Sequence, residues 1–268
     1  MNDYPLHPGK HALLAVPDPA EHAAYVRLGD PEADLSTIDG AVLLYQGWLL
    51  EHAHRNYRTC PRPGWVRGGL HLAYHQGRSF ALCAGFGLGA PAAALVVEQL
   101  VALGVRRIIT VGTAASLQHN LQPGALIVCT SALRDEGLSH HYLPPGHTVC
   151  PSPALTWHLS EALTATGAPV TRGPVWTTDA PYRETTAEVA RYQKDGILAA
   201  DMESAAVFAV GGYRSVATAT VVAVADSLVD RRPRQRSRDT EHALHASLTA
   251  AAQALSSSAT SQKATDEH

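Results

Sequence analysis

Residues 79–111 read SFALCAGFGLGAPAAALVVEQLVALGVRRIITV, and this stretch decides the fold. Its first six residues are mostly apolar and predict a buried strand, which the glycines of the next five residues end in a turn. Pro91 suits the first turn of a helix, and Gly104 marks the end of that helix. A second strand begins at Arg107. The stretch therefore predicts a βαβ unit, the building block of α/β proteins.

The same alternation continues along the chain. Further strands are predicted at residues 125–130, 170–176 and 216–225, and further helices at residues 152–166, 184–194, 202–210 and 240–255. The run at 216–225 is the longest and is typical of a central strand buried on both faces. We therefore expect an α/β fold, with a mixed central β-sheet flanked by helices in a single domain over residues 1–255. Residues 256–268 are rich in Ser, Thr and Ala and predict a disordered tail.

Composition excludes several classes of protein. The 268 residues are 46% hydrophobic and 17% charged, with a formal net charge of −3. This charge argues against partners such as nucleic acid or a membrane surface, because both select a basic face. No apolar run is long enough to span a bilayer, and the first residues lack a secretory pattern. We expect a cytoplasmic protein.

Neither cysteine nor histidine spacing indicates a metal site. The four cysteines form no CxxC pair, and the fifteen histidines are scattered without an HExxH motif. Cys83 and Cys129 lie in apolar runs, where free thiols are ordinary core residues. We therefore expect no metal.

Polar residues follow the predicted strands in four places, where α/β sheets bind their ligands. These places are residues 85–89, 112–116, 201–204 and 226–227. The first reads GFGLG and, with the alanine after it, fits the dinucleotide pattern GxGxxG/A. That pattern also needs an acidic residue after the next strand, and the sequence there is Val-Gly-Thr-Ala-Ala. A small-anion or ribose contact and a purely structural turn both remain open, and an NAD-dependent enzyme is the weaker interpretation.

Two acidic residues at strand ends are candidates for chemistry. Asp226 ends the run VATATVVAVA, where partial desolvation raises the pKa of a carboxyl and suits it to donate a proton. Capping of the next segment, or pairing with the arginines of residues 231–238, explains Asp226 equally well. Glu203 lies among small and apolar residues and needs a partner, either a ligand hydroxyl or a buried arginine.

Four motifs, in order, resemble the purine nucleoside and uridine phosphorylase superfamily, which also contains hydrolytic nucleosidases. They are the glycine turn with its helix and following strands at residues 85–128, TTDAPYRE at 177–184, DMESAAVFAV at 201–210 and VVAVADSL at 221–228. The resemblance covers roughly residues 10–255. It implies an enzyme of nucleoside metabolism that cleaves a glycosidic bond, with a nucleoside as its small-molecule substrate.

The resemblance also implies roles for individual residues. Asp226 matches the general acid that protonates the departing base, and Glu203 matches the carboxylate that holds the ribose hydroxyls. Met202 matches the residue beneath the sugar, and Thr113 a hydroxyl residue near sugar and anion. Tyr182 falls in the loop that contacts the base.

Assembly and cofactors are implied in the same way. Family sites borrow residues across subunit interfaces, so we expect a homodimer or a higher homo-oligomer. His7 matches a histidine that reaches into a neighbouring subunit's site, although a surface histidine explains it as well. No cofactor is expected, and phosphate is a possible co-substrate.

The sequence departs from the phosphorylases where they hold phosphate. One phosphate-binding arginine follows a Gly-Asp-Pro turn, and the matching segment here, residues 16–21, ends in Glu21. A second arginine corresponds to Thr110. Gly87, Thr110 and Thr113 then remain as an anion or water site, because a carboxylate and hydroxyls cannot replace two cations around a phosphate. Arg55, Arg58 or Arg62 would have to restore that charge.

Glu21 suggests hydrolysis, because family hydrolases carry a water-activating glutamate at about this position. The alternative is that Glu21 begins a surface helix over residues 20–28, where an acid is favourable. The base pocket also differs from the family pattern, because Pro181 stands in place of an aromatic residue. This leaves Tyr182 or Trp176 to stack on the base. Residues 134–142 either line this pocket or form a solvated loop.

These observations favour cleavage of a nucleoside N-glycosidic bond, with hydrolysis narrowly ahead of phosphorolysis. A non-catalytic relative that binds a nucleoside-like ligand is the alternative outside enzyme chemistry.

Overall fold

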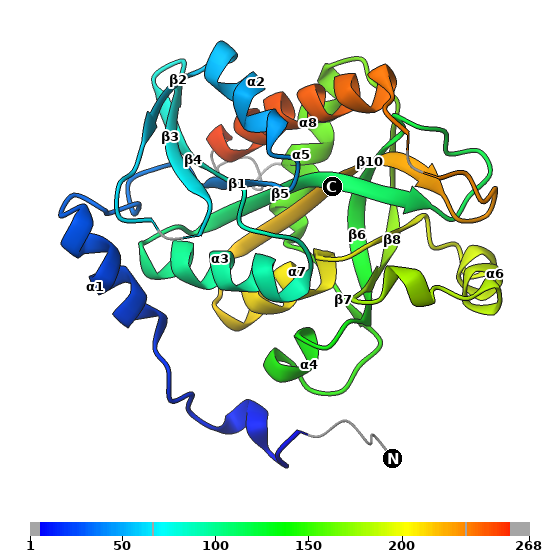
Figure 1. Cartoon of the computed structure of the whole chain (residues 1–268), viewed down its shortest axis with the longest axis horizontal. Coiled ribbons are helices and arrows are strands. Elements are labelled where there is room, and N and C mark those ends of the chain that lie inside the picture. The colour runs from blue at the N-terminus through cyan, green and yellow to red at the C-terminus, as the bar shows by residue number, and fades with distance from the viewer. Residues whose placement is uncertain (1–5, 66, 234, 258–268) are drawn as a thin grey trace, which may run out of the picture.

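A computed structural model describes residues 6–65, 67–233 and 235–257 of the chain. Its centre is a mixed ten-stranded sheet in the order β10-β6-β8-β9-β5-β1-β4-β3-β2, with β7 beside β6 (Figure 1). β10 also pairs with β5, so that part of the sheet closes on itself. The strands are β1 (Ala41–Leu44), β2 (Arg58–Pro61), β3 (Gly69–His75), β4 (Arg78–Ala84), β5 (Arg107–Ser116), β6 (Leu126–Asp135), β7 (Thr148–Val149), β8 (Val170–Thr178), β9 (Ala199–Asp201) and β10 (Ala217–Ser227).

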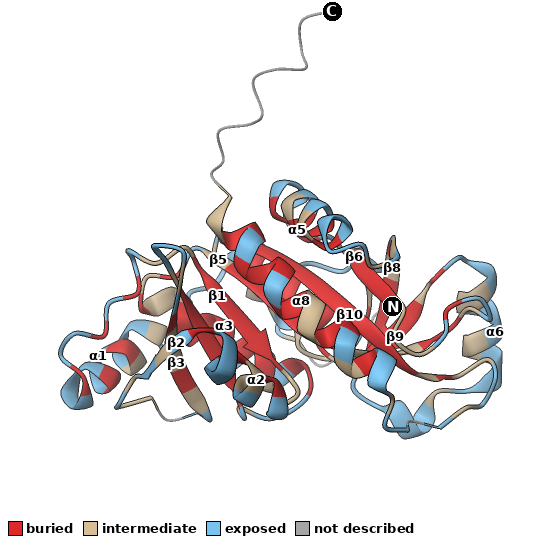
Figure 2. Ribbon diagram, turned by 90° about the horizontal axis from the view of Figure 1, so that it is seen from above, coloured by how far each residue is buried: buried red, intermediate tan, exposed pale blue. Residues whose placement is uncertain are grey.

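Helices cover both faces of the sheet and bury a separate apolar cluster on each side. One cluster joins the strands to α3 and α7, and the other joins them to α2, α5 and α8. Figure 2 shows the strands buried between these helices. The helices are α1 (Pro19–Gly29), α2 (Trp48–Asn56), α3 (Ala90–Ala102), α4 (Ser139–Tyr142), α5 (Pro153–Ala165), α6 (Thr186–Lys194), α7 (Ser204–Tyr213) and α8 (Arg238–Ser256), with short 3-10 turns η1 (Lys10–Ala12) and η2 (Pro181–Arg183).

The predicted fold class is confirmed, and so is the βαβ unit. β4 and β5 both run parallel to β1, which lies between them, and α3 connects them. β10 is central and almost wholly buried, because it pairs in parallel with β5 and antiparallel with β6. α8 reaches Ser256, and residues 258–268, the greater part of the predicted disordered tail, lie outside the described residues.

None of the described helices combines the length and the apolar character that crossing a membrane requires.

A pair of stacked histidines joins α2 to α8. The rings of His52 and His245 lie 3.6 Å apart at 11°, and Trp48 meets His245 edge-on. Burial is the main cause that lowers the pKa of both imidazoles. Among their neighbours, Arg55 and His242 lower these pKa values further, and Glu241 opposes the fall for His245.

Stability should therefore fall as the pH falls. The unfolded chain takes up protons below about pH 6.5, before the two half-buried imidazoles of the native state do, so acid favours unfolding. We expect the urea midpoint to drop between about pH 7.5 and about pH 5.5, and His245→Phe, which keeps an aromatic ring, to reduce that drop. The exposed His147→Phe is the matched control. An unchanged drop in His245→Phe would contradict this interpretation.

Candidate active site

Three adjacent strands bring the candidate acidic residues to one edge of the sheet. Asp226 of β10 pairs with Ala115 of β5, and Ala115 pairs with Ala200 of β9. Neighbouring strands lie about 4.8 Å apart, so the end of β9 is about 10 Å from Asp226. Met202 and Glu203 follow β9 directly. Residues far apart in the sequence therefore meet at this edge.

The backbone is irregular at Asp226. The pairing of β10 with β5 shifts between Val224 and Asp226, which is the signature of a β-bulge. Bulges redirect the side chains that follow them and are frequent beside active sites. The Asp226 side chain is partly buried at this point.

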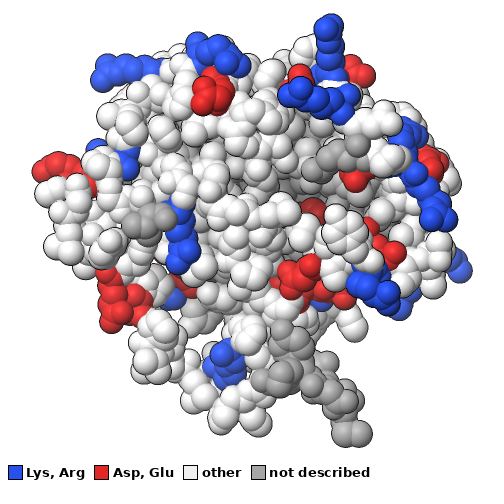
Figure 3. Space-filling model, viewed as in Figure 1, with Lys and Arg blue, Asp and Glu red and all other residues white. Residues whose placement is uncertain are grey.

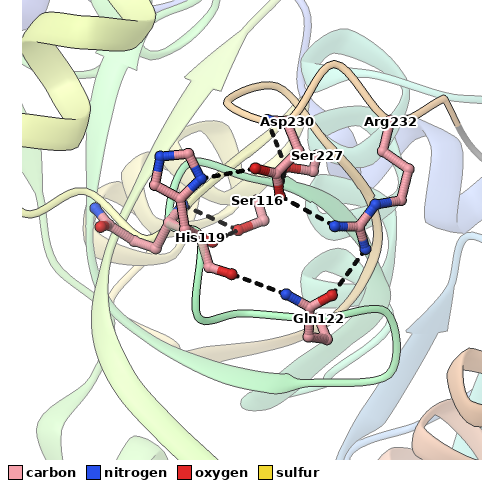
Figure 4. A network of polar contacts seen from close by, with 7 residues as sticks. Ser116, His119, Gln122, Ser227, Asp230 and Arg232 are labelled. Carbon is pink, nitrogen blue, oxygen red and sulfur yellow. Dashed lines mark hydrogen bonds and ion pairs between the residues drawn. The ribbon is translucent and has the colours of Figure 1, made fainter.

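A polar network fixes the loop that follows Asp226 (Figure 4). Asp230 accepts a hydrogen bond from Arg232 at 3.0 Å and pairs with His119 at 2.7 Å. Arg232 also donates to Gln122 at 2.9 Å, and Ser227 bonds Asp230 at 3.2 Å. The loop after β10 is thereby tied to the loop after β5, which holds the end of β10 in place.

Glu203 is buried against the glycine turn. Its carboxylate accepts a hydrogen bond from the backbone N–H of Gly89 at 2.7 Å, and only 5% of the residue is exposed. Gly89 has a φ of +87°, which favours glycine, and a Cβ there would lie 3.8 Å from the methyl group of Met202. The glycine turn therefore contacts both residues that were predicted to hold the sugar.

Asp201 anchors the turn that carries Met202 and Glu203. It accepts hydrogen bonds from the hydroxyl of Thr177 at 2.6 Å and from the backbone N–H of Ser204 at 3.0 Å, and the Ser204 hydroxyl donates to it as well. Burial raises the pKa of Asp201, and these hydrogen bonds oppose the rise. Asp201 thus accepts the first backbone N–H of α7 and holds the turn that carries Glu203.

The turn between β1 and α2 contributes two residues that the sequence analysis missed. The side-chain amide of Gln46 donates to the Thr113 hydroxyl at 3.2 Å. The Tyr45 ring covers Gly112, where a Cβ would lie 2.7 Å from the ring. Burial raises the pKa of Tyr45, and the charges of Glu203 and Asp201 raise it further. Tyr45 therefore lies close to the carboxylates of the site.

Residues 16–21 lie at the start of α1, away from the cluster around Glu203. No strand precedes α1 among the described residues, and the strand–turn–helix segment that reaches the site is β1, its turn and α2. Asp18 caps α1, and Glu21 is exposed in its first turn. Its neighbour His22 shares a cavity with Glu98, about 13 Å along α3 from Gly89. Glu21 is therefore not brought to the cluster around Glu203.

The predicted anion or water site is only partly assembled. Thr110 is fully buried, and its hydroxyl bonds that of Thr220 at 2.7 Å within the sheet. Gly87 is exposed in the glycine turn, with a φ of +110°. Thr113 is half-buried and bonded to Gln46. Thr113 and the glycine turn remain candidates for binding an anion or water. The Thr110 hydroxyl is already hydrogen-bonded to a neighbouring strand.

The two predicted base contacts lie in different environments. Tyr182 in η2 is fully exposed, and Trp176 is 1% exposed in the core, where its ring nitrogen donates to Asp135 at 2.9 Å. The polar segment 134–142 is organised internally. Arg134, for example, donates to the Ser139 hydroxyl at 2.9 Å and to the backbone carbonyl of Pro144 at 2.9 Å.

Glu184, which follows η2, is a further acidic residue of the site that the sequence analysis did not identify. Burial and the negative charge of Asp226 raise the pKa of Glu184 to about 7, with a smaller effect from Glu188. Glu184 therefore lies near enough to Asp226 for the charge of that carboxylate to affect its pKa.

Two of the three candidate cations contact other side chains of the described chain. Arg62 forms an ion pair with Asp30 at 2.7 Å, and Arg58 lies over the ring of Tyr74. Arg55 is exposed on α2. On the face seen in Figure 3, Lys and Arg side chains lie mostly toward the outline of the molecule.

His7 is exposed in the N-terminal segment and lines the same cavity as His22, at the far end of α3 from the glycine turn. The described chain does not bring its own His7 to the cluster around Glu203.

Comparison with known proteins identifies relatives of the chain. A sequence model described as Phosphorylase superfamily matches residues 62–260. Guanosine phosphorylase from Halorubrum lacusprofundi is 28% identical over 188 residues, which are 66% of this chain and 78% of that protein. Uridine phosphorylase from Treponema pallidum is 32% identical over 149 residues, 52% of this chain and 58% of that protein.

A solved structure shows the same fold. The crystal structure of uridine phosphorylase from Vibrio fischeri superposes with a TM-score of 0.71 and 26% sequence identity, over 83% of this chain and 92% of that one. The family model covers well over half of the sequence and includes the glycine turn, Glu203 and Asp226. This chain therefore belongs to the phosphorylase superfamily.

Proposed function

We propose that this protein cleaves the N-glycosidic bond of a nucleoside and releases the free base. One observation carries the proposal: Asp226 on β10 and the turn after β9 that bears Glu203 lie at one edge of the sheet, on two strands that both pair with β5. Two similar proteins are named guanosine phosphorylase and uridine phosphorylase, and these names denote enzymes that cleave or form such bonds. They belong to the same superfamily.

The two carboxyls suit the charges that this reaction develops. As the bond between C1′ and the base breaks, the sugar becomes positive and the base becomes negative. Asp226 donates a proton to the base, which neutralises the leaving group. Glu203, held by Gly89, accepts hydrogen bonds from the ribose hydroxyls and stabilises the positive sugar. Met202 packs beneath the sugar.

Water is the favoured nucleophile. Thr113 and Gln46 offer a hydroxyl and an amide, which bind water but do not neutralise a dianion. The Thr110 hydroxyl is already hydrogen-bonded to the Thr220 hydroxyl, and the carboxylates nearby would repel phosphate. We assign no role to Glu21, because it lies outside the cluster.

Phosphorolysis is the second candidate, because the similar proteins named above are phosphorylases. It would require cations from a neighbouring copy of the chain, since Arg62 is paired with Asp30. Arg55 and Arg58 are exposed and available for such a contact. Assembly into a homo-oligomer is therefore part of this alternative.

The two candidates predict different products from the same nucleoside. Purine and pyrimidine nucleosides should release base and free ribose at rates that change less than about twofold when phosphate is added. Chromatography of the sugar products is the measurement. Phosphate-dependent formation of ribose 1-phosphate would reject hydrolysis in favour of phosphorolysis. Nucleoside binding by calorimetry, without release of base from any nucleoside, would reject both and identify a non-catalytic relative.

A further inference from the structure

A cavity lies at the end of α3 remote from the glycine turn. Its volume is about 680 Å³, within the range of small-molecule sites. The N-terminal segment forms one wall, and the final turns of α3 and α7 form the other, together with α4. Figure 1 shows this segment, in blue, passing beneath the body of the fold. A contact between His11 and the backbone carbonyl of His140, 2.9 Å long, closes it against α4.

The charges within the cavity cancel each other. Glu98, which is 7% exposed, pairs with Arg214 at 2.6 Å and accepts a hydrogen bond from the Tyr142 hydroxyl at 2.9 Å. These bonds and the charge of Glu98 raise the pKa of Arg214. The ion pair therefore leaves little net charge to attract an ionic ligand.

Unsatisfied polar atoms mark the place where a ligand would bind. Gln99 lines the cavity and is 5% exposed, and its side-chain carbonyl oxygen, Oε1, has no hydrogen-bond partner among the described residues. The Nε2 atom of His22 on the opposite wall is also buried without a described partner. Burial, together with Arg67, lowers the pKa of His22, so its ring is neutral at neutral pH. A buried acceptor without a donor is costly. Oε1 itself is shielded from solvent, so a ligand N–H reaches it only when the Gln99 side chain turns toward the cavity, and that hydrogen bond removes the cost.

Apolar side chains line the remaining walls and are still in contact with water. Leu95 on α3 is 44% exposed, and Leu13 and Leu14 of the N-terminal segment are 56% and 98% exposed. A ligand with an apolar body would bury them.

We propose that this cavity binds an uncharged aromatic or heteroaromatic molecule that donates one N–H hydrogen bond to Gln99 Oε1. The site is separate from the proposed catalytic residues, since none of them lines it except the exposed His7, which was assigned to a neighbouring subunit's site. Its occupancy does not depend on whether the protein cleaves nucleosides.

Indole and 1-methylindole test the proposal, because they share an apolar body and differ in the N–H donor. Titration calorimetry of the full chain should show at least about tenfold tighter binding of indole. Gln99→Leu removes the acceptor and should bind both compounds equally weakly. Gln253→Leu, the same change at an exposed position of α8, should behave as the unaltered protein. Equal affinity of the unaltered protein for both compounds would overturn the proposal.

Two further variants distinguish this cavity from the proposed catalytic site. Leu95→Trp partly fills the cavity from a half-exposed position and should weaken indole binding at least about tenfold, even if Gln99→Leu does not fold. Asp226→Asn should bind indole normally. Indole binding that survives Leu95→Trp would place the compound outside this cavity, and displacement by a nucleoside would place it in the proposed catalytic site. Either result would contradict the inference.

Discussion

Replacing Asp226 by Asn should lower kcat/KM for a nucleoside by about 10²- to 10⁴-fold, which is the usual contribution of a general acid. Asparagine has nearly the shape of aspartate but has no carboxyl proton to donate, so the base would leave as an anion. The structure supports a clean test, because the network around Asp230 holds the following loop independently of Asp226.

The measurement is release of base followed by absorbance, with circular dichroism to verify folding. Asp195→Asn is the matched control, because Asp195 is exposed at the end of α6 and forms only a long contact of 3.8 Å with Arg191. Full activity in Asp226→Asn would remove Asp226 from the mechanism.

Replacing Glu203 by Gln should lower kcat/KM for a ribonucleoside by roughly 10²-fold or more. Hydrogen bonds to a charged group contribute about 1.5–3 kcal/mol each, and Glu203 is expected to accept them from the ribose hydroxyls. Glutamine keeps one oxygen that can accept from the backbone N–H of Gly89, so the glycine turn should stay in place.

A substrate without the hydroxyls separates recognition from folding. The 2′,3′-dideoxynucleoside should react slowly with the unaltered enzyme and lose little more in Glu203→Gln. The exposed Glu161→Gln on α5 is the matched control. An equal proportional loss for both substrates would show that Glu203 acts through the shape of the turn instead.

Local sequence patterns were sufficient to predict much of the fold. The strand, glycine turn and helix of residues 79–104 carry their own start and stop signals, and the structure has β4 and α3 there. The apolar run before Asp226 is long enough to identify a buried strand. A carboxyl that directly follows such a strand lies at the carboxyl edge of the sheet, which is why Asp226 could be proposed.

Residues that depend on tertiary pairing were harder to predict. β1 has only four residues, so its periodicity is weak, yet it lies at the centre of the sheet and delivers Tyr45 and Gln46 to the site. Glu184 lies in an irregular loop, and its nearness to Asp226 has no sequence signal.

The positions of Glu21 and Trp176 also depend on packing that the sequence does not reveal. Glu21 was placed by a short match to a turn, but that segment begins a helix that packs against α3. Trp176 was expected beside the base, but it ends in a small core cluster because β8 is covered by Tyr192 of α6. In both cases the pattern of side chains fits more than one environment, and packing between distant elements determines which environment the residue occupies.

A crystal structure with a bound, non-cleavable nucleoside analogue tests the shared site most directly. We predict the base facing Asp226 and both ribose hydroxyls about 3 Å from the carboxylate of Glu203. An analogue that contacts only one of these two carboxyls, or that binds elsewhere on the chain, would contradict the proposed reaction.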